Sequence, residues 1–223
     1  HPDLGMLPPN QFIPLAEEVG LIDHIGQWVF RTACAQQVAW GAYGLGEVSI
    51  AVNLSGVQFQ QANLVDSIRT IVRETGANPA RLELELTEST AMQDAENAVA
   101  IFQQLKTMGF SLSIDDFGTG YSSLAYLKRF PIDTIKIDRA FVKDLASESE
   151  HAAIAIAIIA MAHGLKLRVL AEGVETQPQL DILRDQGCDA IQGYFFSHPL
   201  PADRVEQLIR DLRAKSDYER PAA

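Results

Sequence analysis

Polar side chains that could bind a metal ion stand at the ends of several short, apolar segments of this sequence. Asn53, Glu85 and Asp115 offer oxygen ligands, and Lys136 offers a positive charge. The histidines show no paired ligand spacing, and oxygen donors without His or Cys favour hard cations such as Mg²⁺ or Mn²⁺. The adjacent carboxylates of Asp115 and Asp116 could serve two ions, one each or by bridging. The residue types therefore indicate metal-assisted chemistry.

The alternation of apolar and polar residues predicts that these side chains share one face of a sheet. Leu82, Leu84 and Leu86 alternate with Glu83 and Glu85, and successive residues of a strand point to opposite faces. The same alternation is found in the segments 48–53, 110–115 and 134–138. If the apolar face covers outer helices, the polar face points into a barrel. Its polar residues then converge near the C-terminal ends of the strands, where barrel enzymes place their sites.

Two other interpretations compete with a metal site. Several unpaired carboxylates are costly to bury together, so the group could instead be a structural salt-bridge cluster around Lys136. Asp116, Phe117 and Gly118 also reproduce a metal-binding triplet of protein kinases. The sequence has neither the Gly-rich phosphate loop nor the His-Arg-Asp loop that a kinase needs, so we exclude that activity.

The elements that position these residues alternate between short β-rich segments and helical periods, which is typical of a parallel α/β fold. Six strands are predicted, at 48–53, 81–87, 110–115, 135–137, 167–172 and 190–192. Helices are predicted over 22–40 and 179–186, with others after residue 64, before Gly109, before Gly164 and after Val205. A closed barrel of this kind has eight strands. We therefore expect two strands upstream of residue 1 and a single domain over residues 1–223 that is truncated at its N-terminus.

Composition excludes some classes of partner. The chain has 223 residues, 47% hydrophobic content and a net charge of −11, which argues against binding to a nucleic-acid polymer. No apolar stretch reaches the roughly 20 residues of a membrane-spanning helix, so no membrane contact by this domain is expected. Cys34 and Cys188 are predicted to be reduced thiols, with a disulfide as the alternative. The domain is expected to be cytoplasmic, and it could belong to a larger, membrane-anchored protein. The tail 216–223 is expected to fray.

At this point the sequence resembles the EAL domain family of cyclic di-GMP phosphodiesterases over nearly its whole length. Seven motifs occur in the order and at the spacing of that family. They are Phe12-Ile-Pro-Leu-Ala-Glu17, Val52-Asn-Leu-Ser55, Glu85-Leu-Thr-Glu-Ser89, Asp115-Asp-Phe-Gly-Thr-Gly-Tyr-Ser-Ser123, Lys136-Ile-Asp138, Ala171-Glu-Gly-Val-Glu175 and Gln192-Gly-Tyr194. Each motif alone is weak, and together they are specific.

The resemblance implies a (β/α)8 barrel of the TIM type that hydrolyses one phosphodiester bond of cyclic di-GMP to linear pGpG with two Mg²⁺ or Mn²⁺ ions. It implies that Asn53, Glu85 and Asp115 bind the first metal, and that Asp115 and Asp116 serve the second. Lys136 would orient or activate the attacking water, and Glu172 would assist at the second metal. The resemblance also assigns substrate binding or loop support to four further residues, which are Glu88, Gln192, Glu175 and Asp138.

The segment after Asp116 is predicted to have a role beyond connection. In the family, the loop from Gly118 to Ser123 links the metal site to a homodimer interface formed by the loop and the helix after it, and Glu88 is expected to anchor that loop. A simple connector is the alternative. Fusion to sensor or diguanylate-cyclase domains is also expected from the resemblance.

The sequence departs from the family at one point. In the family, the Glu of the Glu-Ala-Leu segment is a metal ligand, and the Arg that follows the segment contacts the substrate phosphate. Neither is among the 223 residues, and we expect both just before His1. Without that Glu, a catalytically inactive cyclic di-GMP receptor is the alternative function. A purely structural interaction domain is a third hypothesis, which leaves the converging polar face unexplained.

Overall fold

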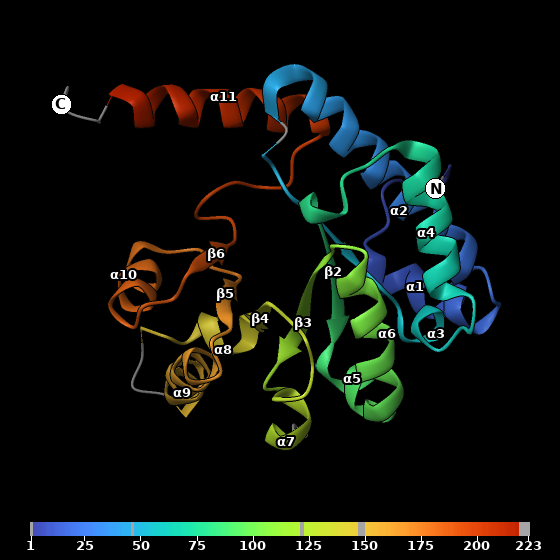
Figure 1. Ribbon diagram of the computed structural model, residues 1–223. Coiled ribbons are helices and arrows are strands. Elements are labelled where there is room, and N and C mark those ends of the chain that lie inside the picture. The colour runs from blue at the N-terminus through green and yellow to red at the C-terminus, as the bar shows by residue number, and fades with distance from the viewer. Residues whose placement is uncertain (1, 46, 121–122, 147–149, 219–223) are drawn as a thin grey trace.

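Six parallel strands form the centre of the described part of the protein, in the order β1-β2-β3-β4-β5-β6. The computed structural model describes residues 2–45, 47–120, 123–146 and 150–218, with side chains up to residue 213. In Figure 1 the sheet curls between two groups of helices. The strands are β1 (Ile50–Asn53), β2 (Leu82–Thr87), β3 (Ser111–Phe117), β4 (Thr134–Ile137), β5 (Arg168–Glu172) and β6 (Ala190–Gln192). The predicted α/β class and its six strands are confirmed.

Most strand positions agree with the prediction, and β3 shows the largest deviation at a C-terminal end. The prediction ended this strand at Asp115, whereas β3 continues to Phe117, which pairs with Ile137 of β4. β1 begins at Ile50, two residues later than predicted. The extension of β3 matters because it carries both adjacent carboxylates, Asp115 and Asp116, within one strand.

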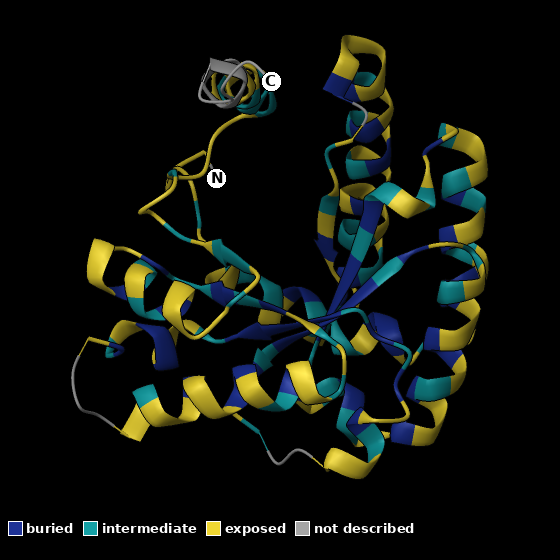
Figure 2. Ribbon diagram, turned by 60° about the vertical axis from the view of Figure 1, so that its left-hand side comes forward, coloured by how far each residue is buried: buried dark blue, intermediate teal, exposed yellow. Residues whose placement is uncertain are grey.

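The apolar residues of the alternation predicted for β2 are buried, as expected. Leu82, Leu84 and Leu86 are almost completely buried and lie in one hydrophobic core with residues of the surrounding helices. Glu85, which the alternation assigns to the opposite face, is also buried. Figure 2 shows this distribution, with buried strands inside and exposed residues on the outer sides of the helices. The hydrophobic effect therefore fixes the face of the strand, and that face sets the direction of the polar side chains.

Helices connect the strands and cover the outer side of the sheet (Figure 1). The helix predicted over 22–40 is α2 (Ile22–Trp40), and the helix after residue 64 is α4 (Leu64–Thr75), which Gly76 ends with a φ of 71°. The remaining helices are α1 (Pro9–Glu18), α3 (Gly56–Phe59), α5 (Glu88–Gln93), α6 (Ala95–Thr107), α7 (Leu124–Leu127), α8 (Arg139–Lys143), α9 (Glu150–Gly164), α10 (Gln177–Asp185) and α11 (Ala202–Tyr218), with the short turns η1 (Gly41–Leu45) and η2 (Pro79–Arg81).

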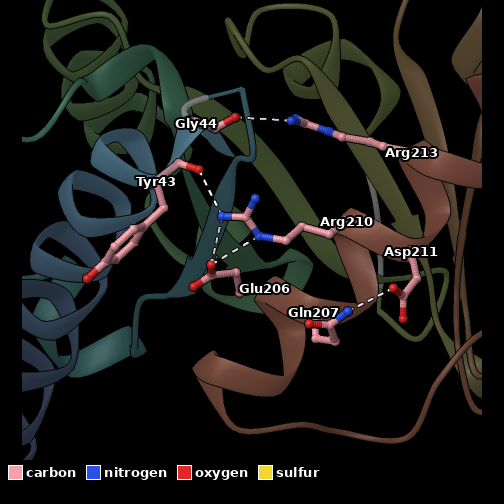
Figure 3. Close-up of polar contacts among 7 residues, drawn as sticks. All are labelled: Tyr43, Gly44, Glu206, Gln207, Arg210, Asp211 and Arg213. Atoms are coloured by element: carbon pink, nitrogen blue, oxygen red, sulfur yellow. Dashed lines mark hydrogen bonds and ion pairs between the residues drawn. The ribbon is translucent and has the colours of Figure 1, made fainter.

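Helix α11 extends away from the strands in Figure 1 and contacts η1 through two arginines. Arg210 Nη2 donates to the carbonyl oxygen of Tyr43, and Arg213 Nη1 to that of Gly44, each at 3.1 Å (Figure 3). Cationic side chains bind the carbonyl groups at a helix end favourably. Helix α11 continues to Tyr218, and residues 219–223 lie outside the described part, so the expected fraying of the tail from residue 216 stays a prediction.

No helix within the described residues is long and apolar enough to cross a membrane. Cys34 and Cys188 are both free thiols, as predicted.

Candidate metal and phosphodiester site

Asp115 and Asp116 reach the same site because β3 is irregular between Ile114 and Phe117. The register of β3 against β4 shifts there, and Asp116 has a φ of 53°. In a regular strand, consecutive side chains face opposite sides, so Asp116 would point into the outer apolar layer. A bulge re-aims one side chain, and aspartate tolerates a left-handed backbone better than most residues. The irregularity therefore places two adjacent carboxylates side by side.

Glu172, at the end of β5, completes a group of three carboxylates with Asp115 and Asp116. One oxygen of each lies within 4.8 Å of the others, and among the described residues this is the one group of three or more acidic, His or Cys side chains with that geometry. Asp115 is buried and the other two are half-buried. Three half-buried or buried carboxylate oxygens at this spacing suit a hard divalent cation. The donor set thus fits Mg²⁺ or Mn²⁺.

Lys136 of β4 lies beneath this group and contacts three carboxylates at once. Its Nζ is 2.6 Å from Glu172 Oε1, 2.9 Å from Glu85 Oε2 and 3.4 Å from Asp115 Oδ1. Burial alone would lower the pKa of Lys136, but the charges and hydrogen bonds of these carboxylates outweigh it and raise the pKa above 10.5. Lys136 is therefore a protonated ammonium at neutral pH, which donates hydrogen bonds and does not accept a proton.

Asn53 and Glu85 lie opposite each other in the register of β1 and β2. Asn53 ends β1 with an exposed side chain, and a cavity of about 640 Å³ borders it. Glu85 points to the buried side and pairs with Lys136, and burial raises the pKa of its carboxyl group. Glu85 is outside the three-carboxylate group. The structure thus brings Asp115, Asp116, Glu172 and Lys136 together, with Glu85 joined to them through the lysine.

Glu88 lies beside the start of the loop that follows Asp116. Its side chain is buried, and Oε2 accepts a hydrogen bond of 2.8 Å from the backbone N–H of Gly118. Gly120 approaches the same carboxylate so closely that a Cβ there would lie 3.3 Å from Glu88 Oε1. Tyr121 and Ser122 of the predicted dimerisation loop lie outside the described residues. The contact of Glu88 with Gly118 ties the start of the loop after β3 to the end of β2, which Glu88 directly follows.

The other predicted residues surround the group at the ends of β4, β5 and β6. Asp138 caps α8 by accepting a 2.7 Å hydrogen bond from Ala140 N–H, and, after burial and the charge of Asp115, its carboxyl group contributes to the raised pKa of Asp116. Gln192 pairs in register with Glu172. Glu175 is exposed and lies three residues beyond Glu172. All three therefore stand at the same edge of the sheet as the metal group.

Sequence reasoning missed Gln179, which shapes the loop after Glu172. Its side chain is buried, and Oε1 accepts hydrogen bonds from the N–H groups of Glu175 and Thr176 at 2.8 and 3.0 Å. Nε2 donates to the carbonyl oxygen of Lys143 at 3.2 Å. The signal was present, because Thr176 and Gln179 have the spacing of a capping box. This box also starts α10 at Gln177, two residues earlier than predicted.

The pKa of Asp116 is raised from 3.8 to about 6, first by burial and then by the charges of Asp115, Asp138 and Glu172 and a hydrogen bond to Asp138. A raised folded-state pKa means that the folded protein binds a proton that the unfolded chain has already lost. Stability from this group is therefore complete below about pH 3.8 and is lost as the pH rises through 6. Like-charge crowding of this kind marks a place where a cation would be bound favourably.

We therefore expect the metal-free protein to lose stability, relative to an Asp116→Asn variant, as the pH rises from 4.5 to 7. Asparagine keeps the size of the side chain and also tolerates positive φ, so it is a matched replacement. The measurement is the free energy of unfolding in urea, with a chelator present, at several pH values. A difference between the two proteins that stays constant with pH would contradict the proposed crowding of carboxylates.

Comparisons with known proteins agree on one family. Residues 1–199 match the EAL domain family. The chain is 49% identical over 205 residues to the bifunctional diguanylate cyclase/cyclic di-GMP phosphodiesterase MucR of Pseudomonas aeruginosa, covering 92% of this chain and 30% of MucR. It is 45% identical over 213 residues to the cyclic di-GMP phosphodiesterase NbdA of the same organism, covering 96% of this chain and 27% of NbdA. The chain thus spans less than a third of these relatives.

Solved structures support the same relationship. The structure described as PaMucR phosphodiesterase in complex with c-di-GMP superposes with a TM-score of 0.90 at 49% identity, covering 92% of this chain and 83% of that one. The EAL domain of DcpA from Mycobacterium smegmatis gives a TM-score of 0.78 at 40% identity, covering 83% and 84%. The curled six-stranded sheet is therefore the barrel-like sheet of these proteins.

Proposed function

Because this chain belongs to the EAL domain family, we propose that it hydrolyses one phosphodiester bond of cyclic di-GMP, giving linear pGpG, with two divalent cations, Mg²⁺ or Mn²⁺. The observation that carries the proposal is the group formed by Asp115, Asp116 and Glu172, beneath which Lys136 lies. The names of MucR and NbdA, which describe cyclic di-GMP phosphodiesterases, support the substrate.

In the proposed site, Asn53, Glu85 and Asp115 would hold the first cation, and Asp115 and Asp116 would hold the second. Bound cations would offset the charge of the phosphate and of the developing transition state. The net reaction adds water across the phosphorus–oxygen bond, so that hydroxide goes to phosphorus and a proton goes to the leaving ribose oxygen. The contribution of this chain is to hold the carboxylates at fixed spacing on three strand ends.

Lys136 acts in this proposal as a fixed hydrogen-bond donor. In the metal-free protein the surrounding carboxylates outweigh burial and raise its pKa, which favours a role as donor over one as general base. The contacts of Lys136 with Glu172 and Asp115 hold those carboxylates in place. The positive charge of Lys136 also favours a water molecule whose oxygen points toward the ammonium group. Glu172 is then the better candidate to accept a proton from the attacking water, since it is half-buried at the rim of the group.

The arrangement of the whole protein is also a proposal. MucR is described as combining a diguanylate cyclase with its phosphodiesterase, and we propose that this chain works beside further domains in the cytoplasm. A homodimer formed through the loop after Asp116 and α7 is proposed as its assembly; Leu124 of α7 is exposed, as such an interface needs.

The first test is product analysis of cyclic di-GMP incubated with the natural, full-length protein, with Mg²⁺, with Mn²⁺ and with a chelator. We expect linear pGpG with either metal and none with the chelator. Binding of cyclic di-GMP without product in the presence of both metals would overturn the enzyme proposal. It would favour a catalytically inactive receptor instead.

A further inference from the structure

A second concave feature lies beside the metal group, on the same edge of the sheet. It is a cavity of about 470 Å³ between α8, the loop after β5 and α10. Two of its lining residues are sequence neighbours of site residues, since Arg139 follows Asp138 and Gly173 follows Glu172. The lining residues are Arg139, Ala140, Lys143, Gly173, Glu175 and Gln179. In Figure 1 the elements that carry them, α8, β5 and α10, are neighbours.

Two cations of α8 face this cavity. Arg139 and Lys143 are four residues apart, so they project from the same side of the helix, and both are exposed. In the described part of the chain, neither forms an ion pair within 4.0 Å. One carboxylate, that of Glu175, lines the same cavity. The cavity therefore carries an excess of positive charge beside an acidic centre, in a chain whose net charge is −11.

The walls of this cavity are held in place by the protein itself. Buried Gln179 bonds the loop after β5 through Glu175 N–H and bonds the end of α8 through the carbonyl oxygen of Lys143. Gly173 has a φ of 70°, and a Cβ there would lie 2.5 Å from the Cβ of Arg139. Helix α8 therefore packs directly on the backbone beside Glu172. A preformed position of this kind binds a ligand without a large ordering cost.

The substrate has a group that the metal group leaves without a partner. Cyclic di-GMP carries two phosphodiester groups, and the cations serve the one that is cleaved. The other phosphate must also lie near an acidic centre, which repels it unless positive charge is close. Arginine and lysine are the side chains that bind phosphate best, arginine through two parallel hydrogen bonds.

We propose that Arg139 and Lys143 form a subsite for the second, uncleaved phosphate of cyclic di-GMP. This inference rests on the proposed function, and it assigns a substrate-binding role to two residues outside the metal group. The subsite would distinguish a substrate with two phosphates from a simple phosphodiester.

The experiment compares two substrates with the full-length protein and Mn²⁺. Cyclic di-GMP has a second phosphate, and bis(p-nitrophenyl) phosphate has a single phosphodiester. In the double variant Arg139→Gln with Lys143→Gln, we expect the ratio of kcat/KM for cyclic di-GMP to kcat/KM for bis(p-nitrophenyl) phosphate to fall about tenfold or more, mainly through KM, because charge-assisted hydrogen bonds are lost.

Two controls keep the result specific. The swap Arg139→Lys with Lys143→Arg keeps both charges and should restore most of the ratio. The variant Arg73→Gln removes an exposed arginine of α4 and should leave the ratio unchanged. If the ratio in the double variant equals that of the wild type, the subsite is refuted while the enzyme proposal stands. If the wild type cleaves neither substrate, the proposed function fails, and the subsite falls with it.

Discussion

Replacing Asp115 with asparagine is expected to lower kcat/KM for cyclic di-GMP by more than about 100-fold. Mutation of a residue that merely supports a metal ligand already lowers metal affinity or activity by about 10- to 100-fold. Asp115 is the carboxylate that both proposed cations share. It also contacts Lys136 at 3.4 Å and crowds Asp116. Asparagine keeps one oxygen ligand but removes the negative charge that holds the cations.

The same substitution is expected to stabilise the metal-free protein. Removing the charge of Asp115 lowers the pKa of Asp116 toward 3.8 and relieves repulsion among the remaining carboxylates, while Lys136 keeps Glu85 and Glu172 as partners. For a chain of this size, each kcal/mol gained raises the melting temperature by about 2–4 °C. Functional sites commonly combine lower stability with activity in this way.

The measurements are steady-state kinetics with Mn²⁺ and thermal unfolding with a chelator. Asp66→Asn is a matched control, since it removes one carboxylate from the exposed side of α4 and should alter the kinetics little. An Asp115→Asn protein with normal kcat would refute the metal assignment. Loss of activity together with loss of metal-free stability would indicate that Asp115 serves mainly as a partner of Lys136.

Replacing Lys136 with methionine is expected to reduce kcat far more than it changes KM, and to destabilise the metal-free protein by about 3–5 kcal/mol. That is the usual cost of removing one partner of a buried ion pair. The side chain of Lys136 is 4% exposed, and its removal leaves Glu85, Asp115 and Glu172 without a positive charge. Added Mg²⁺ or Mn²⁺ should recover part of the stability, because a cation replaces the missing charge.

The structural salt-bridge interpretation predicts a different result, and a destabilised control separates the two. Leu105→Ala removes a fully buried side chain of α6 and should lower the free energy of unfolding by a similar amount, about 2–5 kcal/mol. Both variants are assayed at a temperature at which circular dichroism shows them folded. We expect Leu105→Ala to remain active and Lys136→Met to be inactive. Equal activity of the two folded proteins would mean that Lys136 is structural, and a raised KM with an unchanged kcat would mean that it binds ground-state phosphate.

The class of fold and the side of the strands that carries the polar residues follow from the pattern of residue types alone. Leucines at 82, 84 and 86 must leave water, and the period of two then commits Glu85 to the opposite face. Helix α2 was predictable because its apolar residues recur at helical spacing, and the end of α4 was predictable because Gly76 adopts a left-handed conformation. Both signals depend only on residues that are close together in the sequence.

The way in which Asp116 and Glu172 join the group depends on contacts between strands that are distant in the sequence. The period of two assigns Asp116 to the outer face, and the prediction ended β3 one residue before it. The register shift between β3 and β4 and the positive φ of Asp116 reverse that assignment. A bulge depends on pairing with a neighbouring strand, which no local pattern contains. Glu172 meets Asp115 because parallel strands align their C-terminal ends, although 57 positions separate the two residues along the chain.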